Sequence, residues 1–574
     1  MKLSKYISVV LILLLSFNLS AQSKSDTIIF KALKDEMSRN LGGLKLENQK
    51  PPFFIQNSLA DGRYFFAKAS LGALIRSREV PLNNSSYRLM VGDYAINDEN
   101  FVSGLQNYNS GGANLSFPID NDYMAIRRAF WLILDRSYKV SIDNYTQKLS
   151  VLKQQNKDKS EIIDDYSRTQ PVTALFPYSE TKYDKTLWEN NIKKISAVFE
   201  NFPQIQSSAV DVFIFNANIY TINSEGSKIR SSVKTACILV NASTQAMDGE
   251  LLNDHVLCYA PVSEGLPSVD EISAKVKQMA ENLNKRRSAP IIEEAYQGPV
   301  VFEGDALAEL FNNKLFSNNG LLTSREPLYA VVSSKGMNNK IENKIGKRLC
   351  AENISIVSEP KTKVFNNTPL VGSYDIDTEG VVPQNGLMLV DKGILKTLLS
   401  DRIPTPKIKE SNGSSRFNLT GNIRQKSPGV INVTYSNGQT YADLLKSVAT
   451  ETAKNGLEYY YIVRKFETSN IVQSIQPSPS GFTKPVAIYK VSVKTGNEEL
   501  VRCANISEFP LLSFKYALGG TTEKVAYNLV NNTVLPISYI VPKAMAFNDI
   551  SLEKDNSPKG KLPIVENPLV KASK

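Results

Sequence analysis

The sequence predicts an α+β protein with an N-terminal α/β domain and a mainly β C-terminal domain. Residues 22–290 carry several helical patterns between strand-like segments, whereas residues 291–552 consist mostly of short apolar runs. Glycine and turn pairs such as Ser436-Asn437-Gly438 separate these runs. Hydrophobic residues make up 42% of the 574-residue chain, which is sufficient for sizeable cores.

The N-terminus has the features of a signal peptide over residues 1–21. Lys2 and Lys5 precede an almost wholly apolar run over 7–17, and small residues lead to a cleavage position before Gln22. The run is short for a membrane span, and a retained anchor helix is the alternative. We expect an exported protein, periplasmic or extracellular, with no membrane anchor after signal cleavage.

The N-terminal domain is expected to alternate between helices and strands. Helical patterns cover residues 22–42, 121–165, 182–201 and 268–285, with Asp120 as a plausible N-cap of the second and Ser268 and Glu271 in capping-box spacing at the fourth. Strand-like runs lie at 64–67, 72–75, 87–91, 210–223 and 229–241. Ser288-Ala289-Pro290 is the predicted boundary.

The C-terminal domain begins with a short strand that leads into an amphipathic helix within residues 296–311. The β-rich run Tyr459–Val463 is predicted to be a core strand rather than an aromatic binding platform. Residues 553–574 carry five lysines and three prolines with little apolar material, so we expect a flexible tail there.

The charge pattern argues against a nucleic-acid partner. The net charge is +10, but 67 basic residues are interspersed with 57 acidic ones. The one tight cluster, Lys285-Arg286-Arg287, ends a predicted helix, where cations favour the helix dipole.

Histidine and cysteine content limits the possible chemistry. The single histidine, His255, excludes any zinc site with two or more histidine ligands, and it borders an apolar strand-like run where a structural role is expected. Cys237 and Cys258 lie on two strand-like segments; a disulfide and two buried free thiols both remain open. The run Asp375–Gly380 opens like a calcium loop, but Gly386 stands at the twelfth position, so a turn is predicted.

One set of segments resembles the TldD/PmbA family, also called peptidase U62 or modulator of DNA gyrase. The resemblance rests on Arg230 and on seven segments that follow one another in the family's order: 220–226, 244–249, 296–311, 370–374 with 377–380, 389–396, 411–413 and 499–502. It implies a TldD/PmbA-like fold in which an α/β domain precedes a mainly antiparallel β domain.

The resemblance also implies an activity and a departure from it. TldD-type members resemble zinc peptidases with HExxxH on the helix that starts the C-terminal domain, plus a later cysteine ligand. They cleave unfolded peptide and pair with PmbA-type subunits that lack the metal. Here the two histidine positions map to Phe302 and Leu307, and the catalytic glutamate maps to Glu303. Neither Phe302 nor Leu307 can bind zinc, and no cysteine matches the third ligand.

Three functions follow from these observations. The first is a zinc-less, non-catalytic subunit or peptide-binding module that acts in proteolysis with a TldD-like HExxxH partner or as a homodimer, with unfolded peptide as ligand and no cofactor. The second is a hydrolase that uses a non-zinc site, either serine or threonine with lysine, or carboxylates such as Glu303 and Asp305. The third is a structural protein of envelope assembly.

Overall fold

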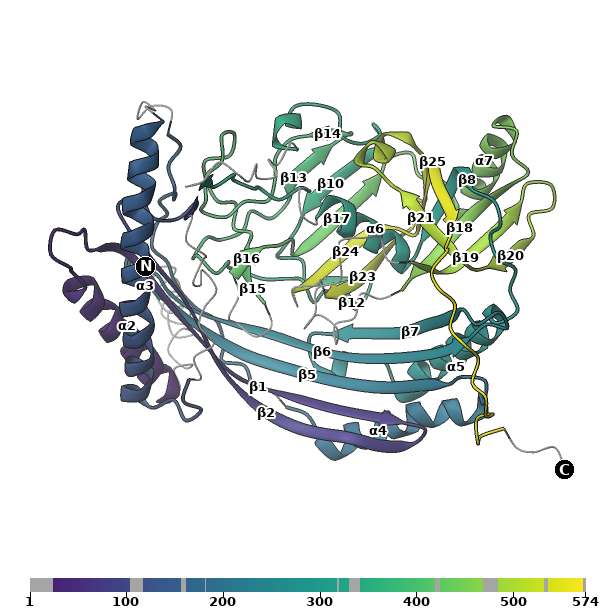
Figure 1. Cartoon of the computed structure of the whole chain (residues 1–574), viewed down its shortest axis with the longest axis horizontal. Coiled ribbons are helices and arrows are strands. Elements are labelled where there is room, and N and C mark those ends of the chain that lie inside the picture. Colours follow the sequence, from purple (N-terminus) through teal and green to yellow (C-terminus); the bar gives the residue numbers. More distant parts are fainter. Residues whose placement is uncertain are drawn as a thin grey trace, which may run out of the picture.

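The computed structural model describes residues 24–103, 117–155, 162–180, 182–316, 320–329, 341–418, 424–467, 484–530 and 535–570. The predicted signal peptide, residues 1–21, lies outside these ranges. The chain forms one curved N-terminal sheet with helices on one face and a C-terminal β domain over the other (Figure 1). This is the α+β class that the sequence predicts, with mainly antiparallel sheets.

The N-terminal sheet has the strand order β2-β1-β5-β6-β4, with β7 also paired to β6. Its strands are β1 (Pro52–Ser70), β2 (Ala73–Val91), β4 (Thr173–Leu175), β5 (Ser207–Asn223), β6 (Lys228–Gln245) and β7 (Leu251–Ala260). Its helices are α2 (Lys24–Gly43), α3 (Tyr123–Gln154), α4 (Lys185–Ala197) and α5 (Val269–Arg286), and short 3-10 turns cover Val198–Asn201 and Ser263–Gly265.

All four helices cover the same face of this sheet. Alternate residues of β1, such as Leu59 and Phe65, pack beneath them, because side chains alternate between the two faces of a strand. The intervening residues, such as Ala60, form a smaller core with Phe417 of the C-terminal domain. The sheet is therefore buried on both faces along its middle.

The C-terminal domain contains two larger sheets, with orders β20-β19-β18-β8-β25-β21 and β14-β13-β10-β17-β24-β23, and β22 pairs with β25. The first sheet is built from β8 (Tyr296–Glu303), β18 (Tyr459–Phe466), β19 (Pro485–Ser492), β20 (Glu498–Val501), β21 (Ala504–Glu508), β22 (Ala517–Gly520) and β25 (Ala544–Lys554). The second is built from β10 (Ile354–Ser358), β13 (Leu387–Asp391), β14 (Ile394–Leu395), β17 (Val430–Tyr435), β23 (Lys524–Val530) and β24 (Pro536–Pro542).

Two helices complete this domain. Helix α6 (Asp305–Leu315) lies in the core that both sheets share, and α7 (Tyr441–Lys454) covers the other face of the first sheet. The small pairs are β11 (Val364–Phe365) with β12 (Thr368–Pro369), β15 (Ser415–Phe417) with β16 (Arg424–Lys426), and β3 (Phe101–Val102) with β9 (Leu328–Tyr329); short 3-10 turns cover Glu342–Lys344 and Leu511–Tyr516.

The hairpin of β1 and β2 is much longer than the separate short strands that the sequence predicts. The polar run around Asp61 and Gly62 looks like a turn, yet Gly62 pairs with Leu82 in mid-strand. A Cβ on Gly62 would lie 2.2 Å from the carbonyl oxygen of Asn216, so glycine allows the close approach of β5. The real turn is at Leu71 and Gly72, both with positive φ.

Other local predictions have mixed outcomes. The N-cap of α3 is Asp122, whose carboxylate accepts a hydrogen bond from the Ala125 amide at 2.7 Å, rather than Asp120. Helix α3 also ends at Gln154, well before residue 165. The capping box of Ser268 and Glu271 is confirmed at α5. Tyr459–Val463 is confirmed as a core strand within β18.

The predicted turn at Asp375–Gly380 is confirmed. Asp377 accepts hydrogen bonds from the amides of Glu379 at 2.9 Å and Val381 at 2.8 Å. Burial and the neighbouring Glu379 carboxylate raise the pKa of Asp377.

Cys237 and Cys258 are buried free thiols. Cys237 lies opposite Tyr259, and Cys258 lies opposite Ile238, in neighbouring registers of the β6–β7 ladder. Since neighbouring registers point to opposite faces of the sheet, the two sulfurs cannot form a disulfide in this arrangement.

A buried charge cluster joins the two halves of the chain. Arg88 on β2 donates to Glu379 at 2.6 Å, and the backbone amide of Arg402 donates to the other carboxylate oxygen at 2.9 Å. The Arg402 guanidinium donates to Glu225 at 2.6 and 2.7 Å. Tyr166 stacks against both guanidinium groups, 4.3 Å from Arg88 and 4.1 Å from Arg402.

A second ionic contact lies at the other end of β6. Arg502 donates to Asp248 at 3.0 Å and pairs with Glu250, and the Cys503 thiol donates to the same Glu250 at 2.8 Å. Lys559, in the segment after β25, also pairs with Asp248. The residues predicted as a tail thus start in a strand, since β25 runs to Lys554, and continue against the N-terminal domain.

We predict that Glu379→Gln destabilises the protein by about 3 kcal/mol, because it leaves the buried Arg88 guanidinium without one of its charged partners. The measurement is the free energy of unfolding from urea denaturation. The exposed Glu281→Gln on α5 is the matched control and should change that free energy by less than about 0.5 kcal/mol. Equal effects of the two substitutions would contradict the interpretation.

Candidate functional site

The segment that the resemblance assigns to a metal motif does not form one helix. Phe302 and Glu303 are the last residues of β8, between β18 and β25. Gly304 has a φ of 63° and makes the turn, and α6 starts only at Asp305. The expectation that residues 302–307 share a helix is therefore wrong: the strand ends inside the segment.

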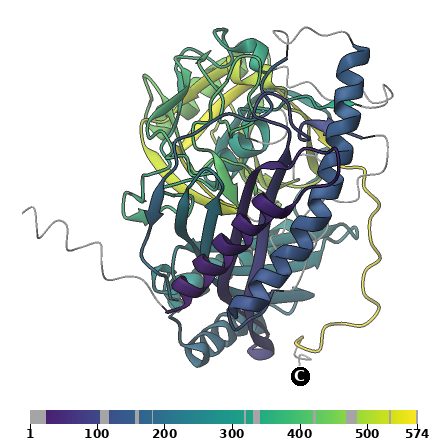
Figure 2. The ribbon, with the colours of Figure 1, turned by 90° about the vertical axis from the view of Figure 1, so that its left-hand side faces the viewer.

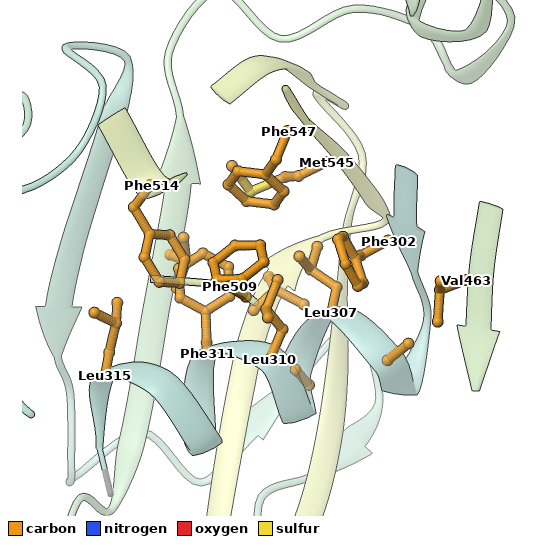
Figure 3. Close-up of a cluster of buried hydrophobic side chains, with 14 of the residues drawn as sticks. Phe302, Leu307, Leu310, Phe311, Leu315, Val463, Phe509, Phe514, Met545 and Phe547 are labelled. Atoms are coloured by element: carbon orange, nitrogen blue, oxygen red, sulfur yellow. The ribbon is translucent and has the colours of Figure 1, made fainter. Parts of the chain in front are cut away.

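Phe302 and Leu307 are fully buried in the largest hydrophobic core. The Phe302 ring lies about 6 Å from those of Phe466, Phe509 and Phe547, and Figure 3 shows both side chains within this cluster. Apolar side chains packed in this way offer no lone pair to a cation, so the residues present here do not fit zinc.

Glu303 points away from this core and forms a polar network. Its Oε1 accepts hydrogen bonds from the Tyr441 hydroxyl at 2.8 Å and from Nε of Arg464 at 2.9 Å. Arg464 continues to Glu498 through two hydrogen bonds, at 2.8 and 2.9 Å. The two carboxylates raise the pKa of Arg464, although burial opposes this shift. Through these hydrogen bonds, Glu303 links the end of β8 to α7 and to β18.

A carboxylate in such a network is a poor general base. It is paired with a guanidinium, and one of its oxygens already accepts two hydrogen bonds, so that oxygen is not open to a proton of a substrate or water. The contacts of Glu303 are those of a structural residue.

Two further carboxyl groups, Asp305 and Glu309, lie about one helical turn apart on α6. Asp305 was among the carboxylates that the sequence suggested, and Glu309 lies four positions later on the same helix face. Burial raises the pKa of both, and the Asp305 charge raises that of Glu309 further. Sequence reasoning missed Glu309, although its spacing from Asp305 was visible.

The only histidine of the chain lies on β7, where Lys465 of β18 reaches the strand. Lys465 on β18 donates to Asp254 at 2.8 Å and to the backbone carbonyl of His255, both on β7. The Lys465 ammonium also lowers the pKa of Asp305. Burial, and then the Lys465 charge, lower the pKa of His255 from 6.5 to about 3. His255 is thus a neutral, buried side chain at the contact between the two halves, as its predicted structural role requires.

Among the residues that the structure describes, no three His, Cys, Asp or Glu side chains lie close enough to share a metal ion. In the same part of the chain, none of the helices has the length and hydropathy required to cross a bilayer.

Comparison with known proteins finds a family model that matches part of the chain. Residues 295–470 match the model of the PmbA/TldA metallopeptidase C-terminal domain. No curated protein sequence matches the chain.

Solved structures share the fold over nearly the whole chain. TldE from Thermococcus kodakarensis has a TM-score of 0.54 at 11% identity, covering 92% of this chain and 99% of its own. A proposed modulator of a DNA gyrase from Thermotoga maritima has a TM-score of 0.56 at 13% identity, with coverages of 91% and 100%. A proposed modulator of DNA gyrase from Bacteroides thetaiotaomicron has a TM-score of 0.54 at 12% identity, with coverages of 93% and 99%.

The chain carries a PmbA/TldA-type metallopeptidase C-terminal domain. This match and the shared fold confirm the resemblance to the TldD/PmbA family that is seen in the sequence.

We predict that the buried His255 makes stability fall on acidification. Between pH 6.5 and 3 the unfolded chain binds a proton at His255 that the folded chain does not, so stability decreases as pH falls, by about 1.4 kcal/mol per pH unit below pH 6. The measurement compares urea unfolding of the wild-type protein and His255→Gln from pH 7 to pH 4. The variant should lack this component, so parallel curves for the two proteins would refute the prediction.

Proposed function

We propose that this protein is an exported, zinc-less TldD/PmbA-family member that acts in proteolysis as a non-catalytic subunit or peptide-binding module. One observation carries the proposal: a chain with one histidine cannot contain the two-histidine HExxxH motif, and that histidine, His255, is buried. Two further observations support the proposal. Phe302 and Leu307 pack in the hydrophobic core, and Glu303 is hydrogen-bonded to Tyr441 and Arg464.

The proposed ligand is unfolded peptide. One sheet of the C-terminal domain ends in a short strand, β20, which pairs with β19 on one side in that sheet. An extended peptide binds such an edge through main-chain hydrogen bonds with little demand on its sequence. This mode of binding needs no metal and suits a subunit that presents substrate to an active partner.

The proposed partner is either a TldD-like protein with an intact HExxxH motif or a second copy of this chain. The similarity to TldE over 99% of that protein supports a role as one subunit of a family assembly.

The test is a zinc and cleavage assay on the mature chain that begins at Gln22. We expect less than about 0.1 zinc per chain by elemental analysis and no cleavage of a reduced, unfolded casein, with saturable binding of the same casein. Stoichiometric zinc with chelator-sensitive cleavage would overturn the proposal.

Two variants separate the alternatives in this assay. A metal-independent hydrolase would cleave casein and lose that activity in Glu303→Ala or Asp305→Ala. A purely structural envelope protein would neither bind nor cleave the casein.

We propose an extracytoplasmic location from the N-terminal residues 1–21. Expression of the full chain should yield a product that begins at Gln22 in the periplasmic or extracellular fraction, identified by intact mass. Substitution of Leu13, Leu14 and Leu15 by Asp should retain the unprocessed chain in the cytoplasm, because the apolar segment is lost. Recovery of a full-length product from the cytoplasm alone in the unsubstituted chain would contradict export.

A further inference from the structure

Helix α3 has an apolar outer face with no covering element among the described residues. Its inner side packs on the N-terminal sheet and α2 through residues such as Phe130 and Leu134. Its outer side carries Met124, Trp131 and Leu132, which are 63%, 44% and 43% exposed. Figure 2 shows α3 along the surface of the molecule, with α2 beside it.

This face differs from those of the other helices. Helices α2, α5, α6 and α7 expose no large hydrophobic side chain among the residues described, and α4 exposes only Leu187. Tryptophan is also the residue type that most often anchors protein interfaces. An exposed tryptophan beside methionine and leucine therefore indicates a docking surface rather than random surface variation.

The charges on this face are arranged symmetrically about its centre. Arg128 and Asp135 are seven positions apart, so they lie within about 20° of each other around the helix. They are equally distant from the midpoint between Trp131 and Leu132, as are Met124 and Lys139. Arg128 forms no ion pair within the described chain, and Asp135 pairs only with the exposed Lys139, at 2.8 Å.

An antiparallel pairing of two such helices would satisfy this pattern. With a two-fold axis at the midpoint, Arg128 of each copy faces Asp135 of the other, and Trp131 faces Leu132. An isologous contact needs this self-complementarity, in which residue i meets j and j meets i. A parallel pairing in register would instead place like charges opposite each other.

We propose that the outer face of α3 binds the α3 of a second copy of this chain, antiparallel, through reciprocal Arg128–Asp135 ion pairs around a Trp131–Leu132 centre. The seam from Met124 to Lys139 is about 24 Å long and about 10 Å wide. That is less than a standard interface buries on each partner, so the dimer is weak, with a Kd on the order of 10 µM.

The test is sedimentation equilibrium of the full mature chain from 1 to 300 µM. We expect a monomer–dimer equilibrium that Asp135→Arg and Arg128→Asp each weaken by at least about tenfold, since each places like charges opposite each other twice. The double variant Arg128→Asp/Asp135→Arg restores opposite charges and should return the Kd to within about threefold of the wild-type value.

Glu281→Arg, an exposed charge reversal on α5, is the matched control and should leave the Kd unchanged. Circular dichroism checks that each variant keeps its helix content, and Trp131→Ala should weaken the dimer independently of charge. A chain that stays monomeric at 300 µM, or a dimer with the same Kd in both single charge variants, would overturn the proposal.

Discussion

The buried charges between the two domains hold this molecule in one arrangement. Arg88 of the N-terminal sheet and Glu379 of the C-terminal domain are almost 300 positions apart, yet they pair with little exposure. Neither charge can leave the interface without losing its partner in a medium of low dielectric constant, and that loss is costly. The stacking of Tyr166 against Arg88 and Arg402 fills the space between the pairs. These polar contacts thus fix the two domains relative to each other, because another arrangement would leave buried charges without partners.

His255 also lies at the contact between the two domains. Strand β7 contacts β18, where Lys465 bonds to Asp254 and to the His255 backbone carbonyl. The only imidazole of the chain is therefore a buried, neutral side chain beside this contact between the domains. The family scaffold is retained, while the one side chain with the chemistry of a zinc-binding histidine belongs to the packing of the other half.

The surface of the molecule suggests how such a scaffold acts. The zinc-less module proposed above would act by binding, and the edge of a C-terminal sheet and the outer face of α3 are two separate surfaces for it. One is suited to extended peptide through backbone hydrogen bonds, and the other to a second copy through a symmetric pattern of side chains. Since the two surfaces lie on different domains, assembly and peptide binding need not compete.

The sequence by itself determined the class of fold, the order of the N-terminal helices and the resemblance to a family. Helical and strand periodicity are local properties, so α5 with its capping box and the strand–helix unit at 296–311 were visible. The single histidine likewise excluded a motif that needs two. Other features depend on contacts between distant residues. The polar stretch around Gly62 is strand because β5 approaches it closely, and Glu303 lies in a polar network because Tyr441 and Arg464 reach it. Only the tertiary structure decides such cases, because the partner that fixes each residue lies more than a hundred positions away.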